Sequence, residues 1–389
     1  LRLYIMKKTK KIILVLALLL ITNLATRMIT LHGLFLGTSG KFEKIVQLEN
    51  FIKENYLFEV EDKNFENGEL KGAVASLGDP YSEYLTADEM KELTEETTGK
   101  FFGIGVYIGP GEDGTITIIS PIKDSPADKA GLKAGDKILQ INGVDFNGDN
   151  ITEASKAIRG DKGSTVKLLI MKNGSDKSQE IEVKRDQVKV ESVLENEIGD
   201  IGYIGITIFG EDTEKDFKRA LDDLTKKGKK GLILDLRGNP GGVVDAAAGI
   251  ADAIVPKGVI VTLKDNKNEV VDEYRSDEDY NNIPMVVLQN GGSASASEIL
   301  AGAIRDYKRA KIVGEKSFGK GIVQTVYPMA KGSGLKLTTA EYFTPSGKSI
   351  HKLGIEPDIK ISEPENIKGI GVEFLDTDTQ LQKALELLK

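Results

Sequence analysis

The feature that most restricts the fold is an alternation of apolar strands and amphipathic helices after residue 200. Strands are expected at 204–206, 232–236, 259–263, 285–288 and 334–342, and helices at 213–226, 243–253 and 297–305. The segment 232–236 is almost continuously apolar, which is typical of a parallel strand covered on both faces. The pattern therefore predicts an α/β core in which helices pack on a central sheet.

The segment 97–186 has a different pattern of short strands, glycine turns and brief helices. Strands are expected at 103–108, 115–118, 135–143, 166–171 and 179–183. A helical turn at 125–131 and a helix at 151–158 stand between them. These features predict a small mixed-sheet domain with two helices, inserted ahead of the α/β core.

Helical segments are expected on both sides of these two regions. Apolar residues recur at helical spacing in 41–96, where 78–80 is a turn signal and Thr86 is a candidate cap for a helix at 88–96. A last helix is expected at 380–388. The domain division that follows is 1–36 for a targeting segment, 41–96 for a helical segment, 97–186 for the small domain, 187–362 for the α/β core and 363–389 for a C-terminal helical segment.

Basic residues stand directly ahead of an apolar run at 12–21; they are Lys7, Lys8, Lys10 and Lys11. A basic segment followed by about 7–15 apolar residues is typical of an export signal, whereas a full membrane span needs about 20. A cleaved signal peptide and an uncleaved signal-anchor both fit this run, and a buried core helix fits poorly beside the lysines. We therefore expect an extracytoplasmic protein, either anchored in the membrane by this segment or secreted.

The residue types that are absent or rare in the sequence exclude several kinds of catalytic and metal-binding site. The chain has no Cys and only two His, at positions 32 and 351. Without Cys there is no cysteine nucleophile, no thiolate zinc site and no disulfide. Lys plus Arg is 52 and Asp plus Glu is 60, and the resulting net charge of −8 argues against a nucleic-acid partner held by phosphate contacts. We expect neither a metal nor a cofactor.

A run of small residues at 290–297 lies between an expected buried strand and an expected helix. It contains Ser293, Ser295 and Ser297. Small residues let a backbone approach a ligand closely, and a helix start offers free N–H groups. Two interpretations remain open from the residues alone: a simple turn with Ser297 as N-cap, or a nucleophilic serine on a strand–turn–helix elbow.

A nucleophilic serine needs a base. His32 lies in the targeting segment and His351 lies in a Gly/Ser/Lys-rich loop, so a lysine is the other candidate. Lys320 is flanked by glycines and apolar residues, and burial without a partner lowers the pKa of a lysine by several units from about 10.4. The segment 314–320 also imitates a phosphate-binding loop, but position 321 is Gly where that motif needs Ser or Thr.

A further glycine cluster, 238–242, follows the apolar strand at 232–236. A glycine-rich turn between a strand and a helix can direct two N–H groups at an oxyanion. A tight turn with no chemical role is the alternative interpretation.

Together these segments resemble the C-terminal processing peptidases, or tail-specific proteases, which are serine proteases with a Ser–Lys pair and an embedded PDZ domain. The resemblance covers about residues 45–362 and rests on motifs at 235–242, 292–298, 318–324, 344–347 and 354–358. It implies a crotonase- or Clp-like α/β protease core with an inserted PDZ domain. It implies Ser295 as the nucleophile, Lys320 as general base and then general acid, and Gln324 as the group that orients Lys320 from one helical turn away, if that segment is helical.

The same resemblance implies an oxyanion hole formed by the backbone N–H groups of Gly241 and Ala296. Gly238 and Gly242 are alternatives to Gly241. Ser317 stands where Thr is common in the family, and the hydroxyl is retained.

Residues 97–186 resemble the PDZ domain of these proteases. The resemblance implies that Gly103, Ile104, Gly105 and Val106 hold the C-terminal carboxylate of a peptide that adds as a strand, with a preference for a nonpolar terminal side chain. A bulged strand start is the alternative interpretation of this loop. Arg159 matches a position that couples peptide binding to assembly of the active site; a surface arginine is the alternative.

The partners implied are protein or peptide substrates bound by their C-termini, the membrane, and a second copy of the chain paired through 41–75 and 370–389. Two other functions compete with that of a protease. One is a catalytically silent PDZ scaffold that binds protein C-termini, which the joint presence of Ser295, Lys320 and Gln324 disfavours. The other is an acyl-transfer enzyme of the crotonase type, which the PDZ insertion and the export segment disfavour.

Overall fold

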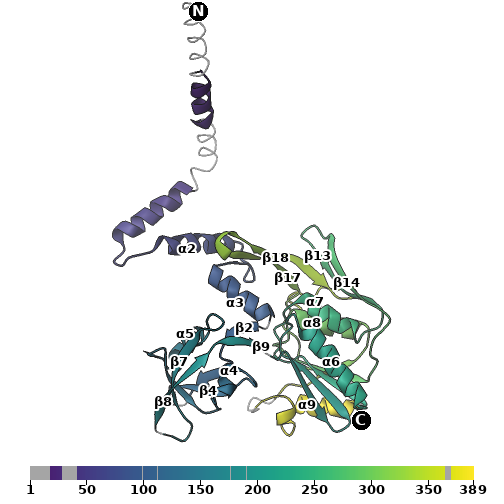
Figure 1. The fold of residues 1–389 in the computed structure, drawn as a ribbon. Coiled ribbons are helices and arrows are strands. Elements are labelled where there is room, and N and C mark those ends of the chain that lie inside the picture. Colours follow the sequence, from purple (N-terminus) through teal and green to yellow (C-terminus); the bar gives the residue numbers. More distant parts are fainter. Residues whose placement is uncertain are drawn as a thin grey trace, which may run out of the picture. The chain divides into compact units, whose positions relative to one another are not determined.

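The computed structural model describes residues 18–28, 42–98, 100–111, 113–175, 177–189, 191–363 and 369–389. The chain divides into two units, Leu1–Ser76 and Leu77–Lys389. The first contains helices at 18–28 and 42–55 and α2 (Asp62–Ala75) (Figure 1). The expected targeting segment, with its apolar run at 12–21, lies mostly outside the described residues. Within the described ranges, no helix combines the length and apolarity needed to cross a bilayer.

A six-stranded sheet forms the centre of the α/β core (Figure 1). Its strands in spatial order are β10 (Val193–Ile198), β11 (Ile201–Ile206), β12 (Gly231–Asp235), β15 (Met285–Gln289), β16 (Lys311–Gly314) and β19 (Ile359–Lys360). Only the β10–β11 pairing is antiparallel; the other four pairings are parallel. The α/β fold expected from the alternation of strands and helices is therefore confirmed.

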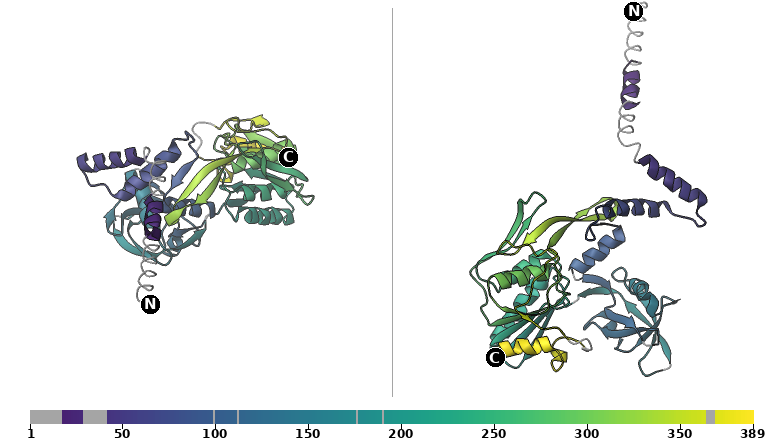
Figure 2. Two further views of the ribbon diagram at one scale, coloured as in Figure 1. Left: turned by 90° about the horizontal axis from the view of Figure 1, so that it is seen from above. Right: turned by 180° about the vertical axis from the view of Figure 1, so that it is seen from behind.

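The helices around this sheet are α6 (Thr213–Lys226), α7 (Val244–Asp252), α8 (Ala296–Asp306) and α9 (Thr379–Leu387). On β12, Leu232 and Leu234 join a core with residues of α6, α7 and α8, whereas Ile233 joins a second core with residues of α9. Successive side chains of a strand point to opposite faces, so both faces of the sheet are covered. This explains why β12 is almost continuously apolar. Figure 2 shows α9, in yellow, well separated from α7 and α8.

A second sheet is antiparallel and includes the strand that follows Lys320. It contains β1 (Glu83–Leu85), β13 (Gly258–Lys264), β14 (Val270–Ser276), β17 (Ile322–Pro328) and β18 (Gly334–Phe343), and the ribbon of β17 and β18 is drawn in yellow-green in Figures 1 and 2. The expected helical relation between Lys320 and Gln324 is wrong, because Gln324 lies in β17. A spacing of four also places two residues on one face of an extended segment, whose side chains alternate with period two.

The small domain is a sheet of β3 (Val106–Pro110), β4 (Ile116–Pro121), β5 (Lys137–Ile141), β6 (Val144–Asp145), β7 (Thr165–Met171) and β8 (Ser178–Lys184), with helices α4 (Pro126–Lys129) and α5 (Ile151–Ile158). Its pairings are all antiparallel, so the sheet is not mixed as the sequence pattern suggested. β3 lies at one edge of the strand order. Two further strands, β2 (Lys100–Gly103) and β9 (Asp186–Lys189), pair with each other at the ends of the domain.

The C-terminal segment is tied to the glycine cluster by buried charges. Arg237 donates from both terminal nitrogens to the carboxylate of Asp378, at 2.8 and 2.7 Å, and neither side chain is exposed. Asp378 also caps α9 by accepting from the Leu381 N–H, and Arg237 contacts Asp235 on its other side. A bidentate pair without solvent screening is strong, and removal of one partner leaves an uncompensated buried charge. The turn that begins at Gly238 is therefore fixed in part by the last helix.

Candidate active site and peptide groove

Ser295 occupies a strained turn between β15 and α8. Its backbone has φ 53° and ψ −115°, and it is the N-cap of the helix that begins at Ala296. A positive φ in a residue with a Cβ costs about 1–3 kcal/mol and is retained where surrounding contacts enforce it. Here the Ser295 N–H donates to the carboxylate of Glu298 at 3.0 Å. The interpretation with Ser297 as N-cap is wrong, because the cap is Ser295.

The hydroxyl groups of the neighbouring serines are committed to the fold. Ser293 Oγ donates to the Leu236 carbonyl at 2.8 Å, and Ser297 Oγ donates to the Asn239 carbonyl at 3.0 Å. Both side chains are buried. Ser295 Oγ donates no hydrogen bond to any described residue, and Ser295 lines an open cavity. Among the three, Ser295 is therefore the serine whose proton is available for transfer.

The cavity at Ser295 measures about 470 Å³. Its lining combines the expected catalytic groups with apolar side chains; it includes Ser295, Lys320, Gln324, Gly241, Tyr342 and Val323. His351 is not among the lining residues, and its Nδ1 is buried without a hydrogen-bond partner among the described residues. Ser295 and Lys320 thus line one cavity, whereas His351 does not.

Lys320 is half-buried in this cavity, and burial lowers the pKa of its amine below the ordinary value. The positive charge of Lys336 lowers the pKa further, and Asp79 opposes the shift. In the described part of the chain, no carboxylate accepts a hydrogen bond from Lys320 Nζ. A lysine in such surroundings has a larger neutral fraction near neutral pH than a solvated one.

Glu298 holds the backbones of the serine and the lysine together. It is fully buried, and one carboxylate oxygen accepts from the N–H groups of Ser295 and Lys320 at 3.0 and 2.8 Å. The other oxygen accepts from Ser317 Oγ at 2.5 Å and from the Gly319 N–H at 2.8 Å. Sequence reasoning missed Glu298, although its position three residues after an N-cap serine is a capping-box spacing that could have indicated this role.

Tyr342, in β18, connects the backbones of Ser295 and Lys320. Its hydroxyl lies 3.0 Å from the Ser295 carbonyl oxygen and 2.6 Å from the Lys320 carbonyl oxygen. Burial raises the pKa of Tyr342 well above its ordinary value, so the hydroxyl stays protonated and can donate. This residue was also missed from the sequence, because nothing local marks it.

The two expected oxyanion donors differ in their present contacts. The Ala296 N–H stands at the start of α8 and has no acceptor among the described residues. The Gly241 N–H donates to Asn239 Oδ1 at 2.8 Å. Gly241 has φ 105°, and a Cβ there would lie 2.7 Å from Ser295 Cβ, so only glycine permits this approach to the serine turn. The Gly242 N–H has no acceptor in the described ranges.

Gln324 lines the cavity, and no hydrogen bond joins its side chain to the amine of Lys320. Its Nε2 donates to Thr338 Oγ1 at 3.3 Å, and Thr338 Oγ1 donates to Asp79 Oδ2 at 2.7 Å. The glutamine is therefore connected to the turn that precedes β1. Its role in orienting Lys320 stays a prediction.

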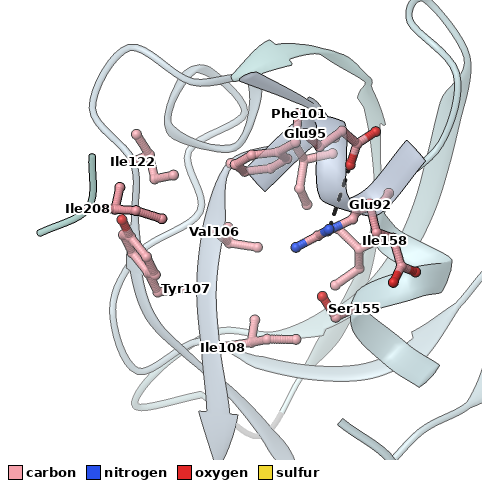
Figure 3. Close-up of a pocket in the computed structure, with 14 residues that line it drawn as sticks. Glu92, Glu95, Phe101, Val106, Tyr107, Ile108, Ile122, Ser155, Ile158 and Ile208 are labelled. Atoms are coloured by element: carbon pink, nitrogen blue, oxygen red, sulfur yellow. Dashed lines mark ion pairs between the residues drawn. The ribbon is translucent and has the colours of Figure 1, made fainter. Parts of the chain in front are cut away.

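A second cavity, of about 580 Å³, lies between β3 and α5 of the small domain. Figure 3 shows Val106 and Ile108 projecting from β3 into it, and Ile158 facing them from α5. The expected carboxylate loop lines one end through Gly103, Ile104, Gly105 and Val106. An apolar groove beside an edge strand is the geometry in which an extended peptide adds to a sheet.

Arg159 stands at the rim of this groove and is engaged by α3 (Ala87–Thr98). Its guanidinium lies 3.7 Å from the carboxylate of Glu95 and 5.3 Å from the ring centroid of Phe101. Figure 3 shows Glu92, Glu95 and Phe101 on one side of the cavity. Arg159 thus contacts the helix before the groove, and its coupling role stays a prediction.

Replacement of Glu298 with glutamine should reduce kcat by about 10²-fold, the cost of a misplacement of about 1 Å. Both carboxylate oxygens of Glu298 accept from backbone N–H groups, so the amide nitrogen of the glutamine faces such a donor in either orientation. That buried N–H group then has no acceptor. We expect the free energy of unfolding to fall by about 1–3 kcal/mol. Steady-state kinetics and thermal unfolding measure both effects.

The matched control for this variant is Glu278→Gln, which removes the charge of an exposed carboxylate. We expect it to change stability by less than about 0.5 kcal/mol and to leave kcat unchanged. Equal kcat in the two variants would contradict a positioning role for Glu298.

Three family models match this chain. The peptidase family S41 model matches residues 200–361, and the PDZ domain model matches residues 117–172. The model described as the activating protease CtpB N-terminal domain matches residues 29–89.

Curated proteins and solved structures agree with these matches. The chain is 41% identical to a carboxy-terminal-processing protease of Bartonella bacilliformis, over 84% of this chain and 77% of that protein. It is 38% identical to the carboxy-terminal processing protease CtpA of Bacillus subtilis, over 96% of this chain and 80% of that protein. The solved structure of a photosystem II D1 C-terminal processing protease superposes with a TM-score of 0.52 at 28% identity, over 87% of this chain and 90% of that one. The resemblance drawn from the sequence motifs is confirmed.

Proposed function

The chain belongs to the carboxy-terminal processing proteases of peptidase family S41, and on this basis we propose that it is an exported endopeptidase that binds the nonpolar C-terminal tail of a protein and cuts peptide bonds with a Ser–Lys pair. It is a serine-type peptidase with a PDZ domain. The observation that carries the proposed mechanism is the cavity that Ser295, whose hydroxyl donates no hydrogen bond to a described residue, shares with Lys320, whose pKa is lowered.

In the proposed reaction, Ser295 Oγ attacks the scissile carbonyl carbon while neutral Lys320 accepts the hydroxyl proton. The tetrahedral intermediate collapses, and Lys320 gives the proton to the leaving amine as the C–N bond breaks. Water then attacks the acyl-enzyme with Lys320 as base again, releases the new carboxylate and restores the Ser295 hydroxyl. Lysine thus performs the role of histidine in a Ser–His pair, and burial supports this by keeping its amine partly neutral.

The proposed oxyanion donors are the N–H groups of Ala296 and Gly241. The first has no acceptor among the described residues and benefits from the positive end of the α8 dipole. The second must exchange Asn239 Oδ1 for the substrate oxygen. An oxygen that carries developing negative charge is a stronger acceptor than a neutral carboxamide, which favours that exchange.

The apolar groove is the proposed site for substrate tails. A peptide that adds to the edge of β3 would place its last side chain against Val106 and Ile158 and its carboxylate at the loop formed by residues 103–106. We also propose that Arg159 senses this carboxylate, because an incoming negative charge competes with Glu95 for the guanidinium.

The proposal also includes a location and a partner. The basic and apolar segment at 7–21 supports a location outside the cytoplasm. The proposed partner is a second copy of the chain, paired through 41–75 and 370–389.

The test is cleavage of an unfolded protein with and without an apolar C-terminal tail, with fragments identified by mass spectrometry. Gly105→Ala should raise KM for the tailed substrate by about tenfold or more and leave short untailed peptides unaffected. Gly105 has φ +77°, and a Cβ there would lie 2.5 Å from Ser125 Cβ, so the loop must shift.

Gly114→Ala is the matched control, since Gly114 has φ +75° in the same domain but an added Cβ would have nothing within 4 Å. It imposes similar backbone strain away from the groove. Equal losses in both variants, or equal losses on tailed and untailed substrates, would contradict a tail-binding role. Tail binding without any cleavage by the unmodified protein would favour the silent scaffold.

A further inference from the structure

The turn between α2 and β1 reaches the amine of Lys320. The ring of Tyr81 lies beneath Lys320 Nζ, with 4.9 Å between the nitrogen and the ring centroid. Tyr81 follows Gly78, Asp79 and Pro80, a turn that lies outside the motifs that indicated catalysis. An aromatic face at this distance attracts an ammonium and holds it in one place.

Asp79 fixes this turn against the wall of the cavity. Its carboxylate accepts from the Tyr81 N–H at 3.0 Å, from Ser82 Oγ at 2.5 Å and from Thr338 Oγ1 at 2.7 Å. Hydrogen bonds to the carboxylate lower the pKa of Asp79 in spite of its desolvation, so it stays ionised. Because Thr338 also accepts from Gln324, the turn and the expected lysine-orienting residue form one network.

We propose that Tyr81 and Asp79 are positioning residues for the base: Tyr81 holds the Lys320 amine in place, and Asp79 secures the turn and stabilises the ammonium that forms when Lys320 takes the proton of Ser295. The inference rests on the proposed role of Lys320. The amine of a lysine base must be neutral before it accepts the proton and is charged afterwards. Groups that stabilise the ammonium therefore accelerate the proton transfer only if other groups keep the resting amine neutral. Burial and Lys336 supply that opposing influence.

The titratable and charged groups around the amine and its immediate neighbours come from the turn, β1, α8 and β18; they are Asp79, Tyr81, Glu83, Glu298, Lys336 and Tyr342. Glu83 pairs with Lys336, and Glu298 accepts from the Lys320 backbone N–H. Tyr342 donates to backbone oxygens and stays protonated. Asp79 and Lys336 are the members whose charges act on the amine with opposite sign.

The first experiment measures kcat and KM on a short untailed peptide for Tyr81→Leu and Tyr81→Phe. Leucine keeps an apolar cover but has no aromatic face, so kcat should fall by about tenfold with KM within about twofold. Phenylalanine keeps the face and should restore kcat to within about twofold. Thermal unfolding checks that both variants are folded. Unchanged kcat in Tyr81→Leu, or an equal loss in Tyr81→Phe, overturns the role of Tyr81.

The second experiment measures the pH dependence of kcat/KM for Asp79→Asn and Lys336→Met. Loss of the negative charge of Asp79 lowers the pKa of Lys320. The acidic limb of the kcat/KM profile should therefore move to lower pH in Asp79→Asn. Loss of the positive charge should move the limb to higher pH in Lys336→Met. Limbs that stay in place or move in the same direction overturn the inference. Failure of the proposed function is separate: it is shown by Lys320→Met retaining full activity.

Discussion

Ser295→Ala should remove all measurable peptide-bond cleavage, an expected loss of at least about 10⁴-fold in kcat, on the scale seen when one member of a serine protease's catalytic unit is removed. Without Oγ no acyl-enzyme forms, and water alone must attack the scissile carbonyl. The free energy of unfolding should fall by no more than about 2 kcal/mol, the cost of losing an N-cap hydroxyl, because Oγ donates no hydrogen bond to a described residue. The measurement is the rate on an unfolded protein substrate, with labelling by a fluorophosphonate and mapping of the labelled residue by mass spectrometry.

Ser293→Ala and Ser297→Ala are the matched controls in the same turn. Each deletes a buried hydroxyl that donates to a backbone carbonyl, so each should lower the free energy of unfolding by about 1–3 kcal/mol. Both should still take the label at Ser295 and cleave substrate. Activity in Ser295→Ala, or a label on Ser293 or Ser297, would reject the assigned nucleophile.

The parts of the fold that sequence reasoning predicted well are those fixed by local periodicity. The helix expected at 213–226 is α6, with the same bounds, because its apolar residues form one face. Thr86 also behaves as expected: it stands before α3, and its N–H donates to Glu89 Oε2 at 2.8 Å. Such features depend on residues within about one turn of each other, which a sequence displays directly.

The relation between Lys320 and Gln324 shows where local spacing is ambiguous. Four residues correspond to about one turn of a helix and also to two full periods of a strand. Either geometry brings the two side chains to the same face, so the motif alone could not distinguish them. The pairing of β17 with β18 decides the question, and that pairing depends on residues beyond the motif.

The groups that organise the site were missed because their partners are distant in sequence. Tyr342 donates to the backbone carbonyl groups of Ser295 and Lys320, which lie 47 and 22 residues before it in the sequence. Asp378 acts on Arg237 across 141 residues. Nothing in the local pattern of a tyrosine or an aspartate identifies such partners, because they are set by the folding of the sheets. Similarly, the Gly-rich cluster indicated N–H donors but not that Asn239 holds one of them.

Lys320→Met should reduce kcat by about 10³-fold, the scale of an essential general base. Methionine keeps most of the side-chain volume and removes the amine. In the unmodified enzyme kcat/KM should rise with pH through the lowered pKa of Lys320, because only the neutral amine accepts the proton. This rise should be absent from the residual activity of the variant.

The pH dependence of the stability of Lys320→Met adds an independent check. Since the folded state disfavours the ammonium, the unfolded chain binds more protons between the lowered pKa and the ordinary one, and stability rises with pH in that window. Lys320→Met should therefore be more stable than the unmodified protein below the window, and the difference should shrink as the pH rises through it.

Two controls separate a base from a nearby positive charge. Lys316→Met removes an exposed lysine that pairs with Glu356 and should leave kcat and its pH profile unchanged. His351→Ala tests the other candidate base and should leave the rate within a few-fold, because His351 does not line the cavity of Ser295. A loss of about 10³-fold in His351→Ala with full activity in Lys320→Met would replace the lysine mechanism by a histidine one. The described geometry argues for the lysine, since its side chain lines the same cavity as Ser295 and the backbones of both residues are held by Glu298 and Tyr342.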